Sequence, residues 1–470
     1  MGLKEIFNFI PEVKKPEEKK LSFNSKAKWT LIILTSFFVL ANVPLFGLSS
    51  NALAKFKYLA IILGTDFGSI ISLGVGPIVM ASIILQLLTG SGIINIDTNT
   101  VEGKKFFQGI QKLFVLFFIL FEATIYVLMQ GLQAMPGFTG IVILQLVLGG
   151  LAIFYMDDVV TKWGFGSGVS LFIGAGISWR IFTSAFQFVD SQGSNCLVNF
   201  TSDVGASCSG KVLVFIQSLI LRNEQVLLSA GAAILATVLI FLAVVWAQSL
   251  KVEVPLAFGR IRGYSIKWPL AFFYASVIPV IFTAALMAQI PLLGGLLQNW
   301  LGHPTILGNF INGQAVCTAE GCGLGFWMGS TNIIEMLIQG GFSSRYLIQG
   351  LTHTIFFVFF STIFAVLWVK TGGMDAKTQA EKIAASGLQV AGFRQDTRIL
   401  ESILNRYIPP LTIMGGVAIG LLASLTDLLG AIVSGTAILL VIMIMFQLYE
   451  QIVKQHSTDM NPAIRKFIGN

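Results

Sequence analysis

Uninterrupted apolar stretches of about 20 residues recur along the chain, with polar segments between them. Each is long enough to cross roughly 30 Å of hydrocarbon as a helix rising 1.5 Å per residue. A membrane β-barrel would instead alternate apolar and polar positions. The pattern predicts an all-α polytopic membrane protein with ten spans, at roughly 29–48, 70–90, 106–130, 138–156, 167–187, 225–250, 269–290, 346–369, 408–426 and 430–450.

Composition and charge agree with this pattern and give it an orientation. Hydrophobic residues make up 55% of the chain and charged residues 11%, which excludes an ordinary soluble protein. Most Lys and Arg residues lie in segments on the N-terminal side of the predicted bundle; the opposite side keeps Lys55, Lys57, Arg180, Lys211, Arg222 and Arg345. By the positive-inside rule, both termini are cytosolic. The polar segment before the first span is no cleavable signal peptide, so we expect that span to be retained.

The spans divide into two halves. We expect a cytosolic segment 1–28, an N-terminal half 29–187, an external hinge 188–224, a C-terminal half 225–452 and a cytosolic tail 453–470. Each half has five spans, an odd number, so the halves are inverted relative to each other. Inverted halves often enclose a pathway near the bilayer midplane.

One apolar segment is too short to span. Residues 55–64 (KFKYLAIILG) end at Gly64, and Asp66 and Gly68 follow before the next helix. A re-entrant helix here would imply an internal vestibule, because irregular backbone at membrane depth must be covered or line a cavity. The alternative is an interfacial helix lying on lipid headgroups.

The four cysteines, Cys196, Cys208, Cys317 and Cys322, all fall in the two long external loops, where disulfides form more readily than on the cytosolic side. A bridge such as Cys317 to Cys322 and free thiols are both open, since spacing does not fix connectivity. A zinc site is less favoured, and no metal is predicted.

Two cytosolic loops, 251–268 and 370–407, are long and basic. The first carries Arg260 and Arg262 and the second carries Arg394 and Arg406. Guanidinium groups on exposed loops suit phosphate or an acidic surface. The alternative is that these charges only enforce the topology.

Signatures of catalysis and of pumping are missing from the sequence. It holds neither a phosphate-binding Gly-Lys-Ser/Thr loop nor an H-E-x-x-H motif. The acidic pair Asp157 and Asp158 ends the fourth span and favours a solvated helix end. Within the spans, Glu122 and His353 stand out, and an ionisable group at membrane depth is a candidate functional residue. The residues alone therefore indicate a polytopic conduit or transporter, without a cofactor.

Several stretches carry a family resemblance: LGVGPIVMASIILQLLTGSGII (73–94), FQGIQKLF (107–114), WGFGSGVSLFIGAGIS (163–178), KVEVPLAFGRIRG (251–263), IPVIFTAALMAQI (278–290), NRYIPPLTIMGG (405–416) and SGTAILLVIMIMFQLYEQ (434–451). With them the chain resembles the SecY family of protein-translocation channels, closer to its archaeal members. The resemblance covers nearly the whole chain, and external loops 188–222 and 291–345 match least.

The resemblance implies an hourglass channel that passes unfolded secretory chains vertically and releases membrane segments sideways into lipid. The apolar ring at its waist would be Val75, Val79, Val169, Ile173, Ile281 and Leu439. A plug, at about 53–66, would include Phe56, Tyr58, Leu59, Ile61, Ile62 and Asp66. Asp66 stands where some relatives carry a basic residue.

The resemblance also implies a lateral gate formed by spans two and seven, with spans three and eight alongside. Its polar positions would be Glu122 and Gln289, and Met80 stands where relatives often carry Thr. Arg260, Arg262, Arg394 and Arg406 would contact a translating ribosome. Further partners would be a SecE-like gamma subunit, a single-span beta-type subunit, signal sequences, nascent polypeptides and membrane lipid. The expected protein is a multi-pass cell-membrane channel and not an enzyme. The alternative is a small-solute secondary transporter with inverted repeats, for which Glu122 is the one candidate coupling carboxylate.

Overall fold

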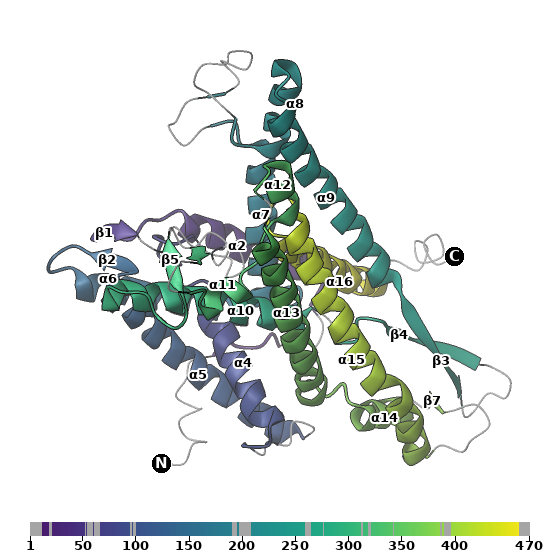
Figure 1. The fold of residues 1–470 in the computed structure, drawn as a ribbon. Coiled ribbons are helices and arrows are strands. Elements are labelled where there is room, and N and C mark those ends of the chain that lie inside the picture. Colours follow the sequence, from purple (N-terminus) through teal and green to yellow (C-terminus); the bar gives the residue numbers. More distant parts are fainter. Residues whose placement is uncertain are drawn as a thin grey trace.

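The computed structural model describes residues 12–17, 21–51, 53, 60, 66–94, 96, 100–189, 195–196, 208–258, 265–275, 277–311, 314–317, 321–341, 343–385, 388–389 and 396–459. Within these residues, ten helices coincide with the ten predicted spans (Figure 1): α2 (Phe23–Ala41), α4 (Gly76–Gly90), α5 (Val101–Leu128), α6 (Thr139–Trp163), α7 (Gly168–Phe186), α9 (Glu224–Ser249), α10 (Ile278–Leu301), α13 (Ser344–Thr371), α15 (Thr397–Leu429) and α16 (Gly435–Asp459). Eight are long and apolar enough to cross a membrane. The other two are α2, whose first turns contain Lys26 and Lys28, and α4, which has only 15 residues.

Several predicted boundaries are wrong because local backbone chemistry overrides hydropathy. The first span starts earlier than 29, since Ser22 caps α2 by accepting the N–H of Ser25 at 3.4 Å. It ends at Ala41, before Pro44 and before Gly47 with its φ of +82°. The second span loses residues 70–75, which form turns. The fourth extends to Trp163, and the seventh begins only at Ile278.

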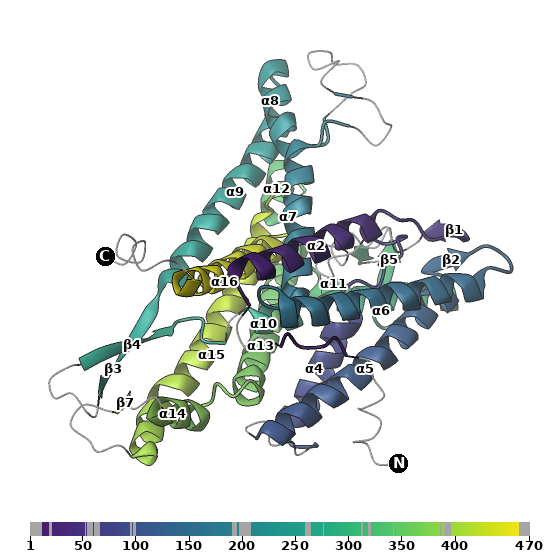
Figure 2. The same cartoon turned by 180° about the vertical axis from the view of Figure 1, so that it is seen from behind.

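The loops contain structure that the all-α prediction omitted. The loop at 251–268 is a hairpin of β3 (Lys251–Phe258) and β4 (Ser265–Ala271), in which Lys251 pairs with Ala271, and β7 (Leu388–Gln389) joins its other edge. Two smaller antiparallel pairs are β1 (Leu48–Asn51) with β2 (Leu132–Ala134), and β5 (Asn309–Ile311) with β6 (Gln314–Val316). Short helices α8 (Lys211–Leu221), α11 (Leu324–Met328), α12 (Ile333–Ile338) and α14 (Ala376–Ala385) complete the order. Helix α8 lies within the expected external hinge and packs alongside the first turns of α9, at the end of the molecule opposite the β3–β4 hairpin (Figures 1 and 2).

Two cores hold these elements. The main core joins apolar side chains of α2, α4, α5, α6, α7, α9, α10, α13, α15 and α16. A second core lies where α14 and the hairpin meet the first turns of α15, a grouping that both cartoons show. There Leu400, Leu404, Ile408 and Leu411 recur at helical spacing and are buried. Asp396 caps this helix by accepting the N–H of Arg398 at 2.9 Å. The ninth span therefore continues an extended helix that starts in the expected loop 370–407.

The N-terminal residues 12–14 form a strap across the ends of α5 and α6. The Glu12 carboxylate forms an ion pair with Lys112 of α5. On α6, Asp158 accepts the Val13 N–H at 3.0 Å and Lys162 donates to the Val13 carbonyl at 2.8 Å; Trp163 Nε1 donates to the Lys14 carbonyl at 2.9 Å.

The sequence predicted that the acidic pair of α6 lies at a solvated helix end. In the structure, both carboxylates instead have specific partners within the protein. Asp158 is bound by the strap and by Lys162 at 2.8 Å, and Asp157 binds the start of α7. Both carboxylates are half-buried.

The hydrogen bond from Lys112 lowers the pKa of Glu12 below its ordinary value of 4.5, although partial burial opposes this. A carboxyl group with a lowered folded pKa stabilises the folded contact above the unfolded pKa, and that contribution is lost as pH falls through the folded pKa. We therefore expect the backbone amides of the strap to be protected from hydrogen exchange at neutral pH. Once the pH drops well below 4.5, this protection, measured against the intrinsic exchange rate at each pH, should be lost.

Glu12→Gln removes the ion pair at neutral pH and should loosen the strap there, so that trypsin cleaves faster after Lys14. The increase should stay below about fivefold, because Glu12 is half-exposed and such ion pairs contribute at most about 1 kcal/mol. Glu17→Gln, at an exposed site of the same segment, is the matched control. Equal cleavage rates in both variants would contradict a role for the Glu12 ion pair.

Candidate functional site

The six predicted waist residues come from four helices. Val75 and Val79 lie at the start of α4, Val169 and Ile173 in the first turns of α7, Ile281 on α10 and Leu439 on α16. Five of them are buried in the main core, and Val169 is half-buried and packs against it. Helix α4 contacts α10, and α16 contacts both α7 and α10. Residues far apart in sequence thus gather in one apolar region.

A cavity of about 290 Å³ adjoins this region. Val79, Val169 and Ile281 line it on the apolar side. Its other walls come from the first half of α5 and the last turn of α13, which are the ends predicted to face the cytosol. Polar side chains on these walls are Gln108, Gln111 and Thr371, joined by Ser82 and Gln86 of α4 and Asp157 of α6. The rest of the lining is apolar and includes Phe107, Phe282 and Trp368. We call this cavity, with polar groups set into a mainly apolar lining, the vestibule.

The three predicted gate residues lie on neighbouring helices. Met80 is half-buried on α4, while Glu122 on α5 and Gln289 on α10 are 7% and 6% exposed. Helix α4 contacts α5, α10 and α13, so the four gate helices are in contact. Within the described part of the chain, Glu122 Oε2 and Gln289 Nε2 have no hydrogen-bond partner. One side-chain hydrogen bond joins two of these helices, because Gln111 Nε2 of α5 donates to Ser82 Oγ of α4 at 2.8 Å. These atoms of Glu122 and Gln289 are buried without such a partner among the described residues.

Tyr126 belongs to the same region but was not predicted. It lies one turn after Glu122 on α5, is 2% exposed, and its hydroxyl has no partner among the described residues. Its ring meets that of Phe67 edge-on, with centroids 6.4 Å apart. The i, i+4 spacing from Glu122 was the available signal, but a tyrosine in an apolar helix gives no sign of its partner.

Asp66 forms an ion pair with Arg180 of α7. The segment after Asp66 is also fixed, because Asn51 Nδ2 donates to the Phe67 carbonyl at 2.7 Å and the Leu45 N–H donates to the Gly68 carbonyl at 2.8 Å. Asp66 thus has a basic partner on α7. Nothing in the sequence around Arg180 could have indicated this contact.

Comparison with known proteins assigns the chain to a family. A SecY family profile matches residues 69–449. The chain belongs to the SecY family. Protein translocase subunit SecY of Methanothermobacter thermautotrophicus is 40% identical, with 99% of this chain and 98% of that protein covered.

Solved structures show the same likeness. One entitled "The structure of a protein conducting channel" is 34% identical, with a TM-score of 0.81 and 99% of both chains covered. Sec61 in the canine ribosome-channel complex from the endoplasmic reticulum is 33% identical, with a TM-score of 0.78 and 99% of both chains covered. The resemblance noted in the sequence is thus confirmed, on the archaeal side, and the chain has the multi-pass helical fold of the SecY family.

Several SecY-family positions predicted from the sequence lie outside the described residues. These are the plug positions Phe56, Tyr58, Leu59, Ile61 and Ile62, and the basic positions Arg260, Arg262 and Arg394. Arg406 is described: it is exposed, and it lies on helix α15 and not on a loop as predicted. Helix α15 includes Arg406 because Asp396 caps the helix ten residues earlier, and the second core buries one face of the first turns.

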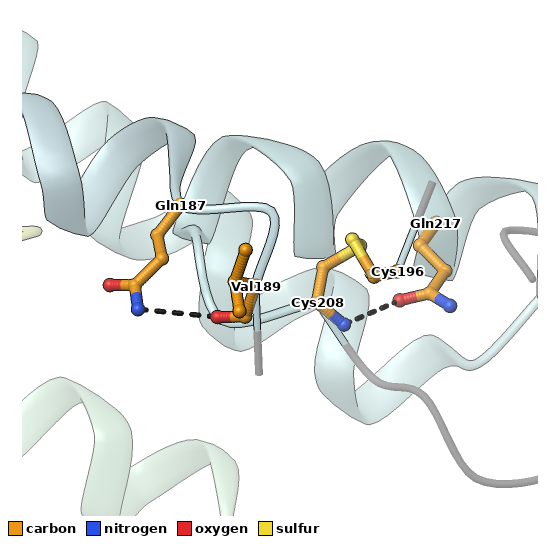
Figure 3. The surroundings of a disulfide bond; sticks show 5 residues. All are labelled: Gln187, Val189, Cys196, Cys208 and Gln217. Carbon is orange, nitrogen blue, oxygen red and sulfur yellow. Dashed lines mark hydrogen bonds between the residues drawn. A yellow bond between two sulfur atoms is a disulfide. The ribbon is translucent and has the colours of Figure 1, made fainter. Parts of the chain in front are cut away.

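The structure pairs the external cysteines of this SecY-family chain, which the sequence left open. Cys196 is bonded to Cys208 and Cys317 to Cys322. The first bridge lies beside α8, where the Cys208 N–H donates to Gln217 Oε1 at 3.2 Å (Figure 3). Gln187 Nε2 donates to the Val189 carbonyl at 3.2 Å in the same loop. The bridged loop is thus held against α8.

The other ionisable group singled out within the spans, His353, has a structural position. It is 2% exposed on α13, and its Nδ1 lies 2.8 Å from the Met328 carbonyl, to which the imidazole must donate. Its Nε2 lies 3.6 Å from Asp427 of α15, which accepts hydrogen bonds from the backbone N–H and the hydroxyl of Thr436. This cluster joins α11, α13, α15 and α16 at one point.

A double-mutant cycle tests the ion pair of Asp66 and Arg180. Asp66→Arg should lower the unfolding temperature of the purified channel by placing two like charges together, and adding Arg180→Asp should restore it. Both groups are partly exposed, so we expect a coupling energy of about 0.5–1 kcal/mol. Strictly additive effects of the two substitutions would show that the charges do not interact.

Proposed function

We propose that this chain is the central pore-forming subunit of a Sec translocation channel. It passes unfolded secretory polypeptides across the membrane and releases transmembrane segments sideways into lipid. The observation that supports this most directly is the set of buried apolar side chains from α4 and α7 of the first half and α10 and α16 of the second, three of which line the vestibule.

An apolar constriction explains how such a conduit can be tight at rest. A narrow apolar passage excludes water and therefore ions, and needs no charged filter. Val, Ile and Leu side chains from separate helices can move apart for a polypeptide and close behind it. The SecY relatives named above are translocase and channel subunits, and we propose that this chain likewise has no catalytic role.

The transporter alternative is not favoured. A coupled transporter needs ionisable groups gathered at a substrate site near the midplane. Among the described residues, the fully buried carboxylates are Glu122 and Asp427. Asp427 is occupied by Thr436 and approached by His353, which leaves Glu122 alone as a candidate.

Partners and orientation are part of the proposal. We place both termini in the cytosol of a cell-membrane protein, so that the β3–β4 hairpin and Arg406 face a ribosome, whose phosphates suit arginine. Sec61 bound to a ribosome supports this arrangement by similarity. A SecE-like gamma subunit, a single-span beta-type subunit, signal sequences and membrane lipid are the further partners. Residues 53–66 would form the plug.

Disulfide trapping tests the conduit. In a channel whose four native cysteines are replaced by Ser, Val79→Cys should crosslink to a single cysteine in a ribosome-stalled secretory chain. The crosslink should appear only at the chain lengths that place that cysteine in the waist.

The matched control is Val238→Cys, on the exposed apolar surface of α9. Val238 should give no crosslink with the same secretory chains. If Val79 gave none at any chain length, with ribosomes bound and the complex intact, the waist assignment would be wrong.

A further inference from the structure

The start of α7 is capped by a side chain from another helix. Asp157, in the second-to-last turn of α6, accepts the backbone N–H of Val169 through Oδ1 at 2.9 Å. The residue at the usual capping position, Ser167, makes no side-chain hydrogen bond to the helix. The first N–H groups of a helix have no partner within it, and a carboxylate near them is further favoured by the helix dipole. Asp157 therefore fixes the first turn of α7.

Gly168 allows this contact. A Cβ atom at position 168 would lie 2.6 Å from both the Cα and Oδ1 atoms of Asp157, closer than real Cβ contacts occur. The end of α6 and the start of α7 therefore touch backbone to backbone at this position. A side chain there would separate the two helices and lengthen the hydrogen bond to Val169.

The hydrogen-bonded residue belongs to the waist. Val169 lines the vestibule together with Val79 and Ile281, and Asp157 lines the same cavity. The neighbouring carboxylate, Asp158, has different partners, namely Lys162 and the Val13 N–H. The two adjacent acids of α6 therefore have separate partners, and of the two it is Asp157 that accepts a hydrogen bond from a predicted waist residue.

We propose that Asp157 is a positioning residue of the waist: it holds Val169 against Val79 and Ile281 and so keeps the resting channel closed to ions. The inference rests on the proposed channel function. An apolar seal depends on a narrow passage, so a small displacement of one of its side chains admits water and ions. Without Asp157 the first turn of α7 loses its cap, and Val169 moves with it.

The experiment measures the resting ion conductance of the purified channel complex in planar bilayers. Asp157→Ala should raise it roughly tenfold, equivalent to about 1.4 kcal/mol, within the range for loss of a helix cap. Asp157→Asn should stay near wild type, because the Asn Oδ1 accepts the same N–H. Asp158→Asn is the matched control and should not leak. Gly168→Ala should leak although Asp157 is intact, since it separates the same two helices.

Val79→Gly separates failure of this inference from failure of the proposed function. If Val79→Gly leaks and Asp157→Ala does not, the waist stands and the positioning role is wrong. If neither variant leaks, the waist assignment itself is wrong. Equal leaks from Asp157→Ala and Asp157→Asn would also overturn the proposal, because the hydrogen bond and not the charge is held to act.

Discussion

A conduit for polypeptides must block ions with side chains that carry no charge, and this constraint shapes the rest of the molecule. No single helix can close such a passage, so the seal needs side chains from several helices at one level. We propose that α4, α7, α10 and α16 supply them here, two helices from each half of the chain. The seal is only as reliable as the placement of these four helices. Contacts at the helix ends therefore matter as much as the apolar residues themselves.

Apolar surface alone does little to place helices in a membrane, because lipid tails are as apolar as the neighbouring helix. Polar contacts between segments accordingly help to place the helices in this chain. The strap ties α5 to α6, Asp157 ties α6 to α7, Asp66 meets Arg180 of α7, and the His353 cluster joins α13, α15 and α16. Three of these six helices, namely α5, α7 and α16, carry predicted waist or gate residues. The polar contacts thus fix the geometry that the apolar seal needs.

The sequence predicts the existence of the ten spans well, because length and hydropathy are local properties. Prediction from the sequence fails where part of an apolar segment is not helical. Pro44 and Gly47 end the first helix within an apolar stretch, and Trp268 to Ala271 continue a strand. The hairpin was readable in part, since its first strand begins with the alternating residues KVEV (251–254), but its partner strand was not.

The candidate site was less accessible from sequence. Valines at 75 and 79 share a helical face, yet hydropathy does not distinguish a pore from lipid, and family resemblance supplied the six waist positions. Arg180, Tyr126 and the role of Asp157 were missed. Their partners lie at positions 66, 67 and 169, and such long-range pairings leave no periodic signal.

The unpaired polar atoms of the gate complete the argument. A buried group without a hydrogen-bond partner costs about 1–3 kcal/mol, so Glu122, Tyr126 and Gln289 make the described arrangement less stable than perfect apolar packing would. Separation of the gate helices would give these atoms water or a polar backbone to bind, which offsets part of the lost packing. Met80 contributes no hydroxyl that could satisfy them in the packed state. We propose that an apolar waist and a gate with unpaired polar atoms serve the two requirements of a channel that seals ions and yet opens sideways.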